Sequence, residues 1–256
     1  MKVVLLAGGF GTRLSEATQL IPKPMVEIGG KPILWHIMKH YNQFGFNEFI
    51  ICCGYKQYVI KEYFANYFMH NCDITVDLSD NSLEVLDNHS ENWKVTMVDT
   101  GLNTMTGGRI NRVKKYVGNE PFLLNYGDGL SDVNIIDTIE AHQKSGKVLS
   151  MMAYQPSGKL GVLEIDDTDS VLSFKEKPDQ GGSWINAGFF VCEPELFDYL
   201  GDDTEMFERQ PMERIMAAKQ LHAYKHTGFW KAMDTLNDNK EFNKLWDAGN
   251  APWKNW

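Results

Sequence analysis

The stretch LLAGGFGTRLSEATQLIPKPM, Leu5–Met25, decides the fold, because it joins an apolar strand to a loop rich in glycine and positive charge. The strand, Lys2–Ala7, runs into three glycines, and Arg13 and then Lys23, which stands between two prolines, follow them. The glycines are Gly8, Gly9 and Gly11. Glycine lets backbone N–H groups approach phosphate oxygens, and the two cations supply the opposite charge. The stretch therefore predicts a loop that holds a nucleoside triphosphate.

Two better-known phosphate loops do not fit this stretch. A dinucleotide-binding fingerprint requires a third glycine three residues after the second, and Leu14 stands there. A P-loop ends in Gly-Lys-Ser/Thr, whereas Gly11 is followed by Thr12 and Arg13. The remaining alternative is an ordinary glycine turn between a strand and a helix. The Pro22-Lys23-Pro24 clamp argues against that alternative.

The composition limits the possible classes of function. The chain has 256 residues, 43% of them hydrophobic, which is enough for one large domain. Its net charge of −9 disfavours nucleic-acid binding, because a nucleic-acid binder carries a basic face. No apolar run approaches the ~18 residues that a membrane span requires, and the first residues do not read as a signal peptide. We therefore expect a cytoplasmic protein that binds neither nucleic acid nor membrane.

Strand and helix patterns alternate through the first half of the chain, which predicts a Rossmann-like, mixed but mostly parallel sheet with helices on both faces. The expected strands are Lys2–Ala7, Glu48–Cys53, Val95–Val98 and Pro121–Tyr126, and the expected helices are Pro32–Phe44, Gln57–Phe68, Gly108–Val117 and Asn134–Ser145. Ligands bind beyond the carboxyl ends of the strands in such α/β sheets. Because the glycine loop and Asp128 both lie at strand carboxyl ends, we expect them to share a cleft.

The second half is richer in strands, and no linker or repeat separates it from the first. The expected strands are Val148–Tyr154, Gly161–Ile165, Val171–Lys175, Ile185–Val191 and Leu221–His226, and the expected helices are Met206–Ala218 and Leu236–Ala248. We therefore expect one domain over residues 1–256. The polar stretch Ser79–Asn92 is the best candidate for a mobile excursion from it.

Two carboxylates are candidate metal ligands. Asp128 stands between two glycines at a strand end, where it is closely approachable, and its alternative role is that of a turn residue. Asp234 precedes the last expected helix, where its alternative role is a helix N-cap. If both converge on one cleft they can hold Mg²⁺ with few protein ligands, and water and substrate phosphates would complete its coordination.

Three further patterns suggest contacts with a substrate. The turn Thr106-Gly107-Gly108-Arg109 is either a nucleotide contact or structural, and Glu176-Lys177 is either part of a site or a solvated surface pair. Asn186 offers both a hydrogen-bond donor and an acceptor, which suits a sugar hydroxyl. Gly188 interrupts the same strand and suggests a close approach of a ligand to the backbone.

Neither the histidines nor the cysteines predict a catalytic or metal site. His36 and His40 lie four residues apart on one expected helix but lack a nearby acidic motif, and His222 and His226 are expected to face solvent. No Cys-x-x-Cys pair occurs, so the four cysteines are interpreted as core thiols.

The motifs together resemble those of the sugar-nucleotide pyrophosphorylases, a family of nucleotidyltransferases, nearly from end to end. The general signature is the glycine loop through Pro22-Lys23-Pro24-Met25. The features typical of the cytidylyltransferase branch are VEIGGKPILWHIMK (Val26–Lys39), FIICCGYK (Phe49–Lys56), MTGGR (Met105–Arg109), YGDG (Tyr126–Gly129), MDTL (Met233–Leu236) and APWKNW (Ala251–Trp256). The resemblance implies the nucleotide-diphospho-sugar transferase type of fold.

The resemblance also implies a role for each matching position. Lys23 and Arg13 would be catalytic and would contact the reacting phosphates, and Asp128 and Asp234 would ligate Mg²⁺. The nucleotide would be bound by Leu6, Ala7, Gly8, Gly9, Gly11, Thr12, Arg13, Lys23, Thr106, Gly107, Arg109 and Asp128. The sugar phosphate would be bound by Tyr126, Glu176, Lys177, Asn186 and Gly188.

The implied reaction joins CTP to α-D-glucose 1-phosphate and releases CDP-glucose and pyrophosphate, which would enter a dideoxysugar pathway for surface polysaccharide. Residues 1–146 would mainly bind the nucleotide, and residues 147–256 would mainly bind the sugar phosphate and form a homo-oligomer, for which the resemblance suggests a hexamer. The aromatic tail Trp253–Trp256 is either an interface or part of the chain's own core.

Some residues depart from the family pattern, and two alternative functions stay open. The departures are Ile21, Lys159, Asn237 and Asn239, and they affect the expected sugar specificity. One alternative is the same chemistry with UTP, dTTP or another phosphorylated substrate. The other is a catalytically silent paralogue, which the presence of Lys23, Asp128 and Asp234 disfavours.

Overall fold

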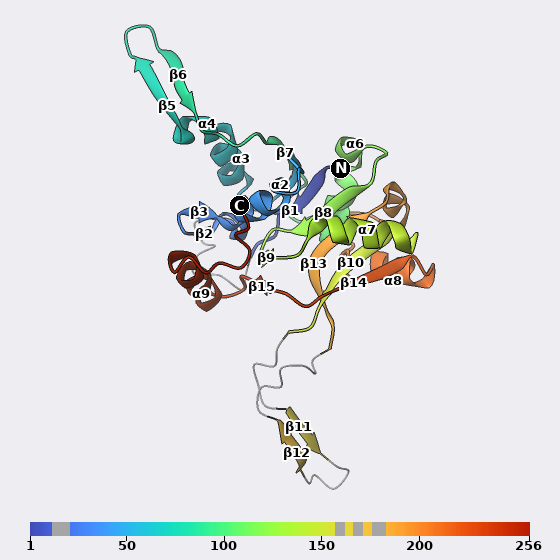
Figure 1. Ribbon diagram of the computed structural model, residues 1–256. Helices are drawn as coiled ribbons and strands as arrows, with labels where there is room; N and C mark the ends of the chain where they lie inside the picture. Colours follow the sequence, from blue (N-terminus) through green and yellow to red (C-terminus); the bar gives the residue numbers. More distant parts are fainter. Residues whose placement is uncertain (12–20, 157–161, 166–170, 176–182) are drawn as a thin grey trace.

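A computed structural model describes residues 1–11, 21–156, 162–165, 171–175 and 183–256 (Figure 1). Its centre is a seven-stranded sheet with the strand order β14-β10-β13-β8-β1-β4-β7. The strands are β1 (Val3–Leu6), β4 (Glu48–Cys53), β7 (Lys94–Asp99), β8 (Phe122–Tyr126), β10 (Leu149–Tyr154), β13 (Ile185–Cys192) and β14 (Leu221–His226). Strand β13 runs antiparallel to β8 and β10, and the other neighbouring pairs are parallel. The predicted mixed, mostly parallel sheet is therefore confirmed.

Helices cover both faces of this sheet, because its strands send apolar side chains alternately to either side. In β1, Val3 and Leu5 belong to one buried cluster, whereas Val4 and Leu6 belong to the other. Helices α2 (Ile33–Asn42), α3 (Gln57–Ala65), α7 (Ile135–Ser145) and α9 (Leu236–Asp247) contribute to the first cluster, and α5 (Thr106–Arg112), α6 (Lys114–Val117) and α8 (Gln210–Ala217) contribute to the second. Two buried faces are typical of sheets whose strands run mostly parallel.

Two predicted helices are each divided in the structure, and the helix expected over Met206–Ala218 begins later, as α8 at Gln210. The single helix expected over Gln57–Phe68 is divided at Asn66 into α3 and α4 (Tyr67–Asn71). The helix expected over Gly108–Val117 begins earlier, at Thr106, and is divided at Val113 into α5 and α6.

The excursion expected at Ser79–Asn92 exists, but it is built as a β-hairpin. Strand β5 (Cys72–Asp77) pairs antiparallel with β6 (Ser82–Asn88), and the hairpin projects away from the body of the molecule (Figure 1). The stretch is polar overall, but it also contains alternating aliphatic residues, among them Leu83 and Val85. Such alternation favours a strand. A second hairpin, β11 (Val162–Ile165) with β12 (Val171–Lys175), lies within the second half of the chain.

Three of the smaller elements lie outside the seven-stranded sheet. They are the 3₁₀ turn η2 (Lys23–Met25), the pair β2 (Glu27–Ile28) and β3 (Lys31–Pro32), and the pair β9 (Gly129–Ser131) and β15 (Trp230–Ala232). Within the described ranges, no helix combines the length and the apolar character needed to cross a membrane.

Trp253 of the C-terminal aromatic tail and two of the histidines are buried in the chain's own core. Trp253 is 0% exposed, and its Nε1–H donates to Nδ1 of His36 at 3.3 Å, so this part of the tail packs internally. His36 and His40 are both buried. His226, which was expected to face solvent, lies instead with its Nε2 2.9 Å from Oδ1 of Asp132, and its side chain is only 11% exposed.

Candidate active site

The glycine loop leaves the carboxyl end of β1 and turns immediately against Arg109. The N–H of Ala7 donates to the carbonyl of Cys52 at 3.1 Å, which keeps the chain beside β4 up to the turn. A Cβ on Gly8 would lie 2.3 Å from Nη1 of Arg109, so a larger residue does not fit there. At Gly9 a Cβ would meet nothing within 4 Å, which leaves the next part of the loop open to a ligand.

Lys23 contacts both candidate metal ligands and is 9% exposed. Its Nζ donates to Oδ2 of Asp128 at 2.6 Å and to Oδ1 of Asp234 at 2.8 Å. Burial by itself lowers the pKa of Lys23, but the charge and hydrogen bond of Asp128, and then those of Asp234, raise it above its ordinary value of 10.5. Lys23 is therefore an ammonium group at neutral pH.

The pairing of two short strands, β9 and β15, brings the carboxylates of Asp128 and Asp234 close together. Asp128 follows β8 and precedes β9, whereas Asp234 follows β15, which pairs with β9. The N–H of Met233 donates to the carbonyl of Asp128 at 2.9 Å. The N-cap of α9 is Thr235, which forms a capping box with Asp238. The alternative role of Asp234 as an N-cap is therefore wrong, and its carboxylate faces Lys23 instead.

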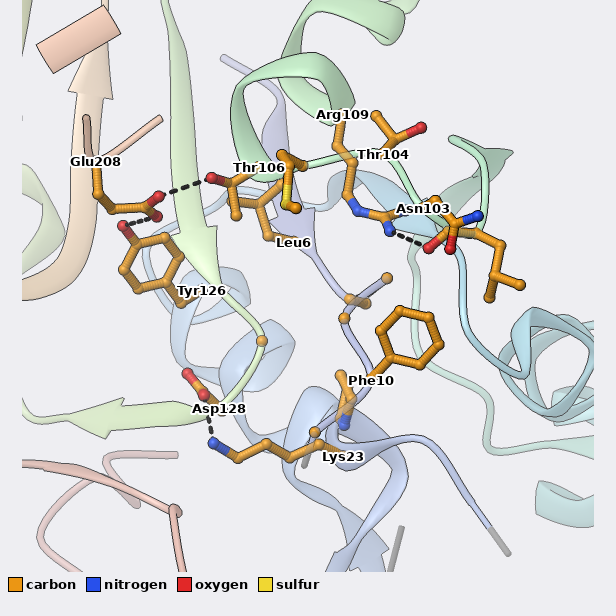
Figure 2. A pocket seen from close by; sticks show the side chains of 18 of the residues that line it. Leu6, Phe10, Lys23, Asn103, Thr104, Thr106, Arg109, Tyr126, Asp128 and Glu208 are labelled. Carbon is orange, nitrogen blue, oxygen red and sulfur yellow. Dashed lines mark hydrogen bonds and ion pairs between the residues drawn. The ribbon is translucent and has the colours of Figure 1, made fainter. Parts of the chain in front are cut away.

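These groups open into a cavity of about 630 Å³ (Figure 2). The predicted site residues that line it are Leu6, Ala7, Gly8, Gly9, Gly11, Lys23, Thr106, Arg109, Tyr126, Asp128 and Asp234. The lining residues that were not named as site residues from the sequence are Phe10, Pro24, Leu102, Asn103, Thr104, Met105, Gly127 and Glu208. The structure thus brings the glycine loop and Asp128 into one cleft, as their places at strand ends predict.

Of the remaining predicted residues, four lie outside the described part of the chain, and three are described but do not line this cavity. Thr12, Arg13, Glu176 and Lys177 lie outside the described residues. Gly107 is buried within α5, where a Cβ would lie 2.8 Å from the carbonyl oxygen of Glu205. Gly107 therefore permits close packing against the segment before α8.

Asn186 and Gly188 do not line the cavity themselves, but both contact Tyr126, which does. Nδ2 of Asn186 donates to the hydroxyl of Tyr126 at 3.2 Å. Gly188 has a positive φ of 80°, and a Cβ there would lie 2.4 Å from Cδ2 of Tyr126. The close approach that was expected at Gly188 is therefore made by the tyrosine ring.

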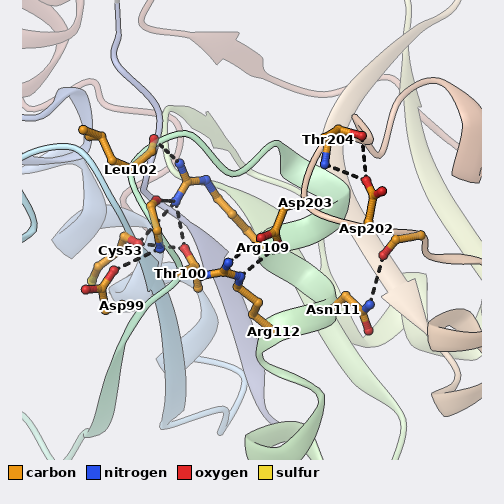
Figure 3. A network of polar contacts seen from close by, with 12 residues as sticks. Cys53, Asp99, Thr100, Leu102, Arg109, Asn111, Arg112, Asp202, Asp203 and Thr204 are labelled. Atoms are coloured by element: carbon orange, nitrogen blue, oxygen red, sulfur yellow. Dashed lines mark hydrogen bonds and ion pairs between the residues drawn. The ribbon is translucent and has the colours of Figure 1, made fainter.

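Arg109 lines the cavity and holds a turn in place (Figure 3). It is 4% exposed, and its Nη1 donates to Oγ1 of Thr100 at 2.8 Å and to the carbonyl of Gly101 at 2.7 Å. Its Nη2 donates to the carbonyl of Leu102 at 3.1 Å. The guanidinium thus fixes the turn after β7 against Gly8 of the glycine loop.

Glu208 is the charged lining residue that sequence reasoning missed. Its Oε1 accepts from the hydroxyl of Tyr126 at 2.6 Å, and its Oε2 accepts from that of Thr106 at 2.7 Å (Figure 2). Burial, followed by the charge of Glu208, raises the pKa of Tyr126 far above its ordinary value, so the phenol keeps the proton that it donates. In the sequence Glu208 belongs to the charged run Asp202–Arg209, which reads as a solvated surface.

The residues around Lys23 fit a divalent cation. Asp128 and Asp234 offer carboxylate oxygens, which are the donors that hard cations prefer. One ammonium and two carboxylates carry charges of +1 and −2, so the cluster has a net charge of −1 before any phosphate arrives. The described residues contain no group of three or more His, Cys, Asp or Glu placed to hold a metal by themselves. The arrangement therefore suits a cation that takes the rest of its ligands from substrate and water.

Comparisons with known proteins agree with this geometry. The family model described as nucleotidyl transferase matches residues 2–250. A glucose-1-phosphate cytidylyltransferase of Salmonella typhi is 52% identical over 257 residues, and a probable glucose-1-phosphate cytidylyltransferase of Bacillus subtilis is 45% identical over 257 residues. Each alignment covers 100% of both chains. The crystal structure of HddC from Yersinia pseudotuberculosis superposes with a TM-score of 0.67 at 25% identity, covering 96% of this chain and 99% of that one.

Proposed function

This chain belongs to the nucleotidyl transferase family, and we propose that it joins CTP to α-D-glucose 1-phosphate, giving CDP-glucose and pyrophosphate. The observation that carries the chemistry is the convergence of Lys23, Asp128 and Asp234 at one end of the 630 Å³ cavity. The full-length relatives named for this activity support the choice of substrates.

In the proposed reaction a phosphate oxygen of glucose 1-phosphate attacks the α-phosphorus of CTP. A bond forms between that oxygen and the α-phosphorus, and the bond from the α-phosphorus to the bridging oxygen of the β-phosphate breaks. Since the attacking oxygen is already ionised at neutral pH, the step requires no general base. The barrier is the mutual repulsion of two polyanions, and Lys23 lowers it by placing a buried positive charge beside the reacting phosphates.

The family generally uses a divalent metal, and in this chain we assign Mg²⁺ to Asp128 and Asp234. When bound, Mg²⁺ supplies positive charge that stabilises the phosphate oxygens. Lys23, which contacts both carboxylates, would then exchange part of this contact for the phosphates of the substrate. Pro22 and Pro24 restrict the backbone on either side of Lys23, which keeps its Nζ near the reacting atoms during this exchange.

The other assignments extend the same proposal along the chain. The glycine loop with Thr12 and Arg13 would bind the triphosphate. Residues 1–146 would mainly hold the nucleotide. Residues 147–256 would mainly hold the sugar phosphate, through Glu176, Lys177 and Asn186 together with Tyr126 of the first part. The hydroxyl of Tyr126 and the amide of Asn186 are suited to hydrogen-bond a hexose.

We also propose that the chain forms a homo-oligomer, with the β5–β6 hairpin as an interface in addition to residues 147–256, to which the resemblance assigns oligomerisation. The hairpin and the loop between its strands expose Val76, Leu78, Leu83, Val85 and Leu86. A two-stranded hairpin is marginally stable in water on its own, so burial of these side chains against a second copy would stabilise it. A Leu86→Glu variant should then show a lower mass by light scattering than the wild type, and an unchanged mass would argue against this interface.

A panel of nucleotides tests the proposed function directly. Purified enzyme is incubated with glucose 1-phosphate, Mg²⁺ and either CTP, UTP or dTTP, and the release of pyrophosphate is measured. We expect CTP to be the preferred nucleotide, chelation with EDTA to stop turnover, and Asp128→Asn and Asp234→Asn each to reduce it strongly. Preference for UTP or dTTP would keep the chemistry and change the substrate, whereas no pyrophosphate release with any nucleotide would overturn the proposal.

A further inference from the structure

The β9–β15 ladder, which brings the two candidate metal ligands together, is short and is fixed at both ends. At one end the N–H of Met233 donates to the carbonyl of Asp128 at 2.9 Å. At the other end the N–H of Asp132 donates to the carbonyl of Phe229 at 3.2 Å. A two-stranded ladder is marginally stable by itself. The place of Asp234, which follows Met233 directly, therefore depends on the contacts that hold the ladder in register.

Side chains reinforce the end of the ladder that lies away from the metal ligands. The N–H of Phe229 donates to Oδ1 of Asp132 at 2.8 Å, and Nε2 of His226 lies 2.9 Å from the same oxygen. Nε2 of His226 also contacts the carbonyl of Phe229 at 3.1 Å, and because a carbonyl oxygen only accepts, Nε2 carries a proton and donates it. Oγ of Ser131 donates to the same carbonyl at 2.8 Å. We call the paired side chains of Asp132 and His226 the Asp132–His226 clamp.

The clamp fastens the ladder to the central sheet. His226 is the last residue of β14, where it pairs in register with the end of β10. The packing is close, since a Cβ on Gly228 would lie 2.4 Å from Oδ1 of Asp132 and 2.8 Å from Cε1 of His226. A second tie holds the middle of the ladder, because Nε1–H of Trp230 donates to the carbonyl of Ala187 in β13 at 2.7 Å. Loss of the clamp would therefore loosen the ladder without removing it.

We propose that Asp132 and His226 are positioning residues for the metal site, because the clamp fixes the register of the ladder and so the place of Asp234 beside Asp128. This inference rests on the proposed function, in which these two carboxylates hold Mg²⁺, and it adds the contacts that keep them together. A slip of one residue turns every side chain of a strand to the opposite face. Neither Asp132 nor His226 lines the cavity, so their effect on the metal passes through the backbone of the ladder.

Mn²⁺ serves as the probe of the metal site in wild type, Asp132→Ala and His226→Ala. Its binding is measured with CTP but without glucose 1-phosphate, by water-proton relaxation, which separates Mn²⁺ on the protein from Mn²⁺ on free CTP. We expect each variant to raise the Kd for Mn²⁺ about tenfold, as for other residues that orient metal ligands. The double variant should bind no more weakly than the weaker single variant, since both changes loosen one rung. Asp132→Asn, which keeps an oxygen for the N–H of Phe229, should recover part of the affinity.

A second measurement requires neither metal nor substrate. Hydrogen exchange of the metal-free protein, followed by mass spectrometry, should be about tenfold faster at residues 229–233 in Asp132→Ala and His226→Ala, because the ladder opens more often. The matched control is His222→Ala on the same strand, where Nδ1 lies 3.0 Å from Oγ of Ser150. This control should lower the free energy of unfolding in urea but should leave the exchange at residues 229–233 and the Kd for Mn²⁺ unchanged.

Asp128→Asn and Asp234→Asn separate this inference from the proposed function. If both weaken Mn²⁺ binding while the two clamp variants bind as wild type does, the inference fails and the metal assignment stands. An equal loss of Mn²⁺ affinity in His222→Ala would also overturn it, since the effect would then follow stability alone, as would wild-type exchange at residues 229–233 in the clamp variants. If neither asparagine variant weakens Mn²⁺ binding, the metal assignment fails and takes the inference with it. Wild-type enzyme that releases no pyrophosphate from CTP would instead refute the proposed reaction.

Discussion

Nζ of Lys23 lies 2.6 Å from Oδ2 of Asp128, so a cation that follows the glycine loop pairs with a carboxylate at the end of a neighbouring parallel strand. Oδ1 of Asp234 lies 2.8 Å from the same nitrogen. The three side chains come from distant parts of the sequence, and no local turn places them together. Their convergence is a property of the whole sheet, and the predicted chemistry depends on it.

Lys23→Ala should lower kcat with CTP and glucose 1-phosphate by about 100- to 1000-fold, or roughly 3–4 kcal/mol, as for other lost charge contacts to a transition state. The variant loses the buried positive charge and leaves Asp128 and Asp234 facing each other without it. Steady-state kinetics at saturating substrate measure the loss. The matched control is Lys94→Ala, since the side chain of Lys94 is 77% exposed and should be dispensable. Turnover of Lys23→Ala close to that of the control would contradict the assigned role.

Gly188→Ala should destabilise the protein and displace Tyr126. The residue has φ of 80°, which costs an alanine about 1–2 kcal/mol, and the new methyl would lie 2.4 Å from the tyrosine ring. Overpacking of this kind adds about 1–3 kcal/mol. Denaturant unfolding measures the loss.

The control for this variant separates backbone strain from the clash. Gly146 also has a positive φ, 60°, but a Cβ there would meet nothing within 4 Å. Gly146→Ala should therefore lose only the part of the unfolding free energy that comes from backbone strain. Equal losses of unfolding free energy in the two variants would show that Tyr126 does not depend on Gly188.

Much of the fold was predictable, because the buried strands are apolar runs that end at glycine or at a charged residue. Strand β4 ends at Cys53 just before Gly54, and the predicted and observed bounds agree. The rule that ligands bind at strand carboxyl ends also placed Asp128 beside the glycine loop. These predictions use only local patterns and the geometry of a parallel sheet.

The rest of the site depends on long-range pairing that no local pattern encodes. Asp234 reaches Asp128 because β15 pairs with β9, and each of these strands has three residues. The role of Arg109 as the support of a turn follows from the carbonyl groups around it, which the sequence does not reveal. Glu208 lies among other charged residues, and only the hydroxyls of Thr106 and Tyr126 distinguish it from a surface side chain.

Stability should fall as the pH drops from about 6.5 toward about 4, in part because of His36. The side chain is 0% exposed, and burial lowers its pKa to about 4 from the ordinary 6.5. Its Nε2 lies 2.8 Å from the carbonyl of Ile28, and Trp253 donates to its Nδ1, so the neutral ring fits with a proton on Nε2. In this pH window the unfolded chain binds a proton that the folded chain does not. This difference lowers the free energy of unfolding by at most roughly 3 kcal/mol.

Urea unfolding of His36→Gln at pH 7 and pH 5 checks this contribution. The variant should start less stable at pH 7 but should lose less unfolding free energy than wild type on going to pH 5. Part of the pH dependence will persist, because burial also lowers the pKa of His40 to about 4. His89→Gln, at an exposed position, should keep the wild-type difference between the two pH values. If His36→Gln and wild type lost the same unfolding free energy between pH 7 and pH 5, His36 would not contribute to the pH dependence of stability.

Arg109→Lys should weaken both the fold and the binding of CTP although it keeps the positive charge. The guanidinium donates from two nitrogens to Thr100, Gly101 and Leu102, a spread that a single ammonium cannot reproduce. Each buried acceptor left without a donor costs about 1–3 kcal/mol. We expect a lower free energy of unfolding and about a tenfold rise in the KM for CTP, with a smaller change for glucose 1-phosphate.

Arg112→Lys on the same helix provides the comparison that isolates geometry from charge. Arg112 pairs with Asp203 at the surface, where both side chains are more than 40% exposed, and such pairs contribute about 0–1 kcal/mol. Its replacement should change neither stability nor KM measurably. If Arg109→Lys behaved like Arg112→Lys, the turn after β7 would hold its shape without the guanidinium, and Arg109 would act on the nucleotide through its charge alone.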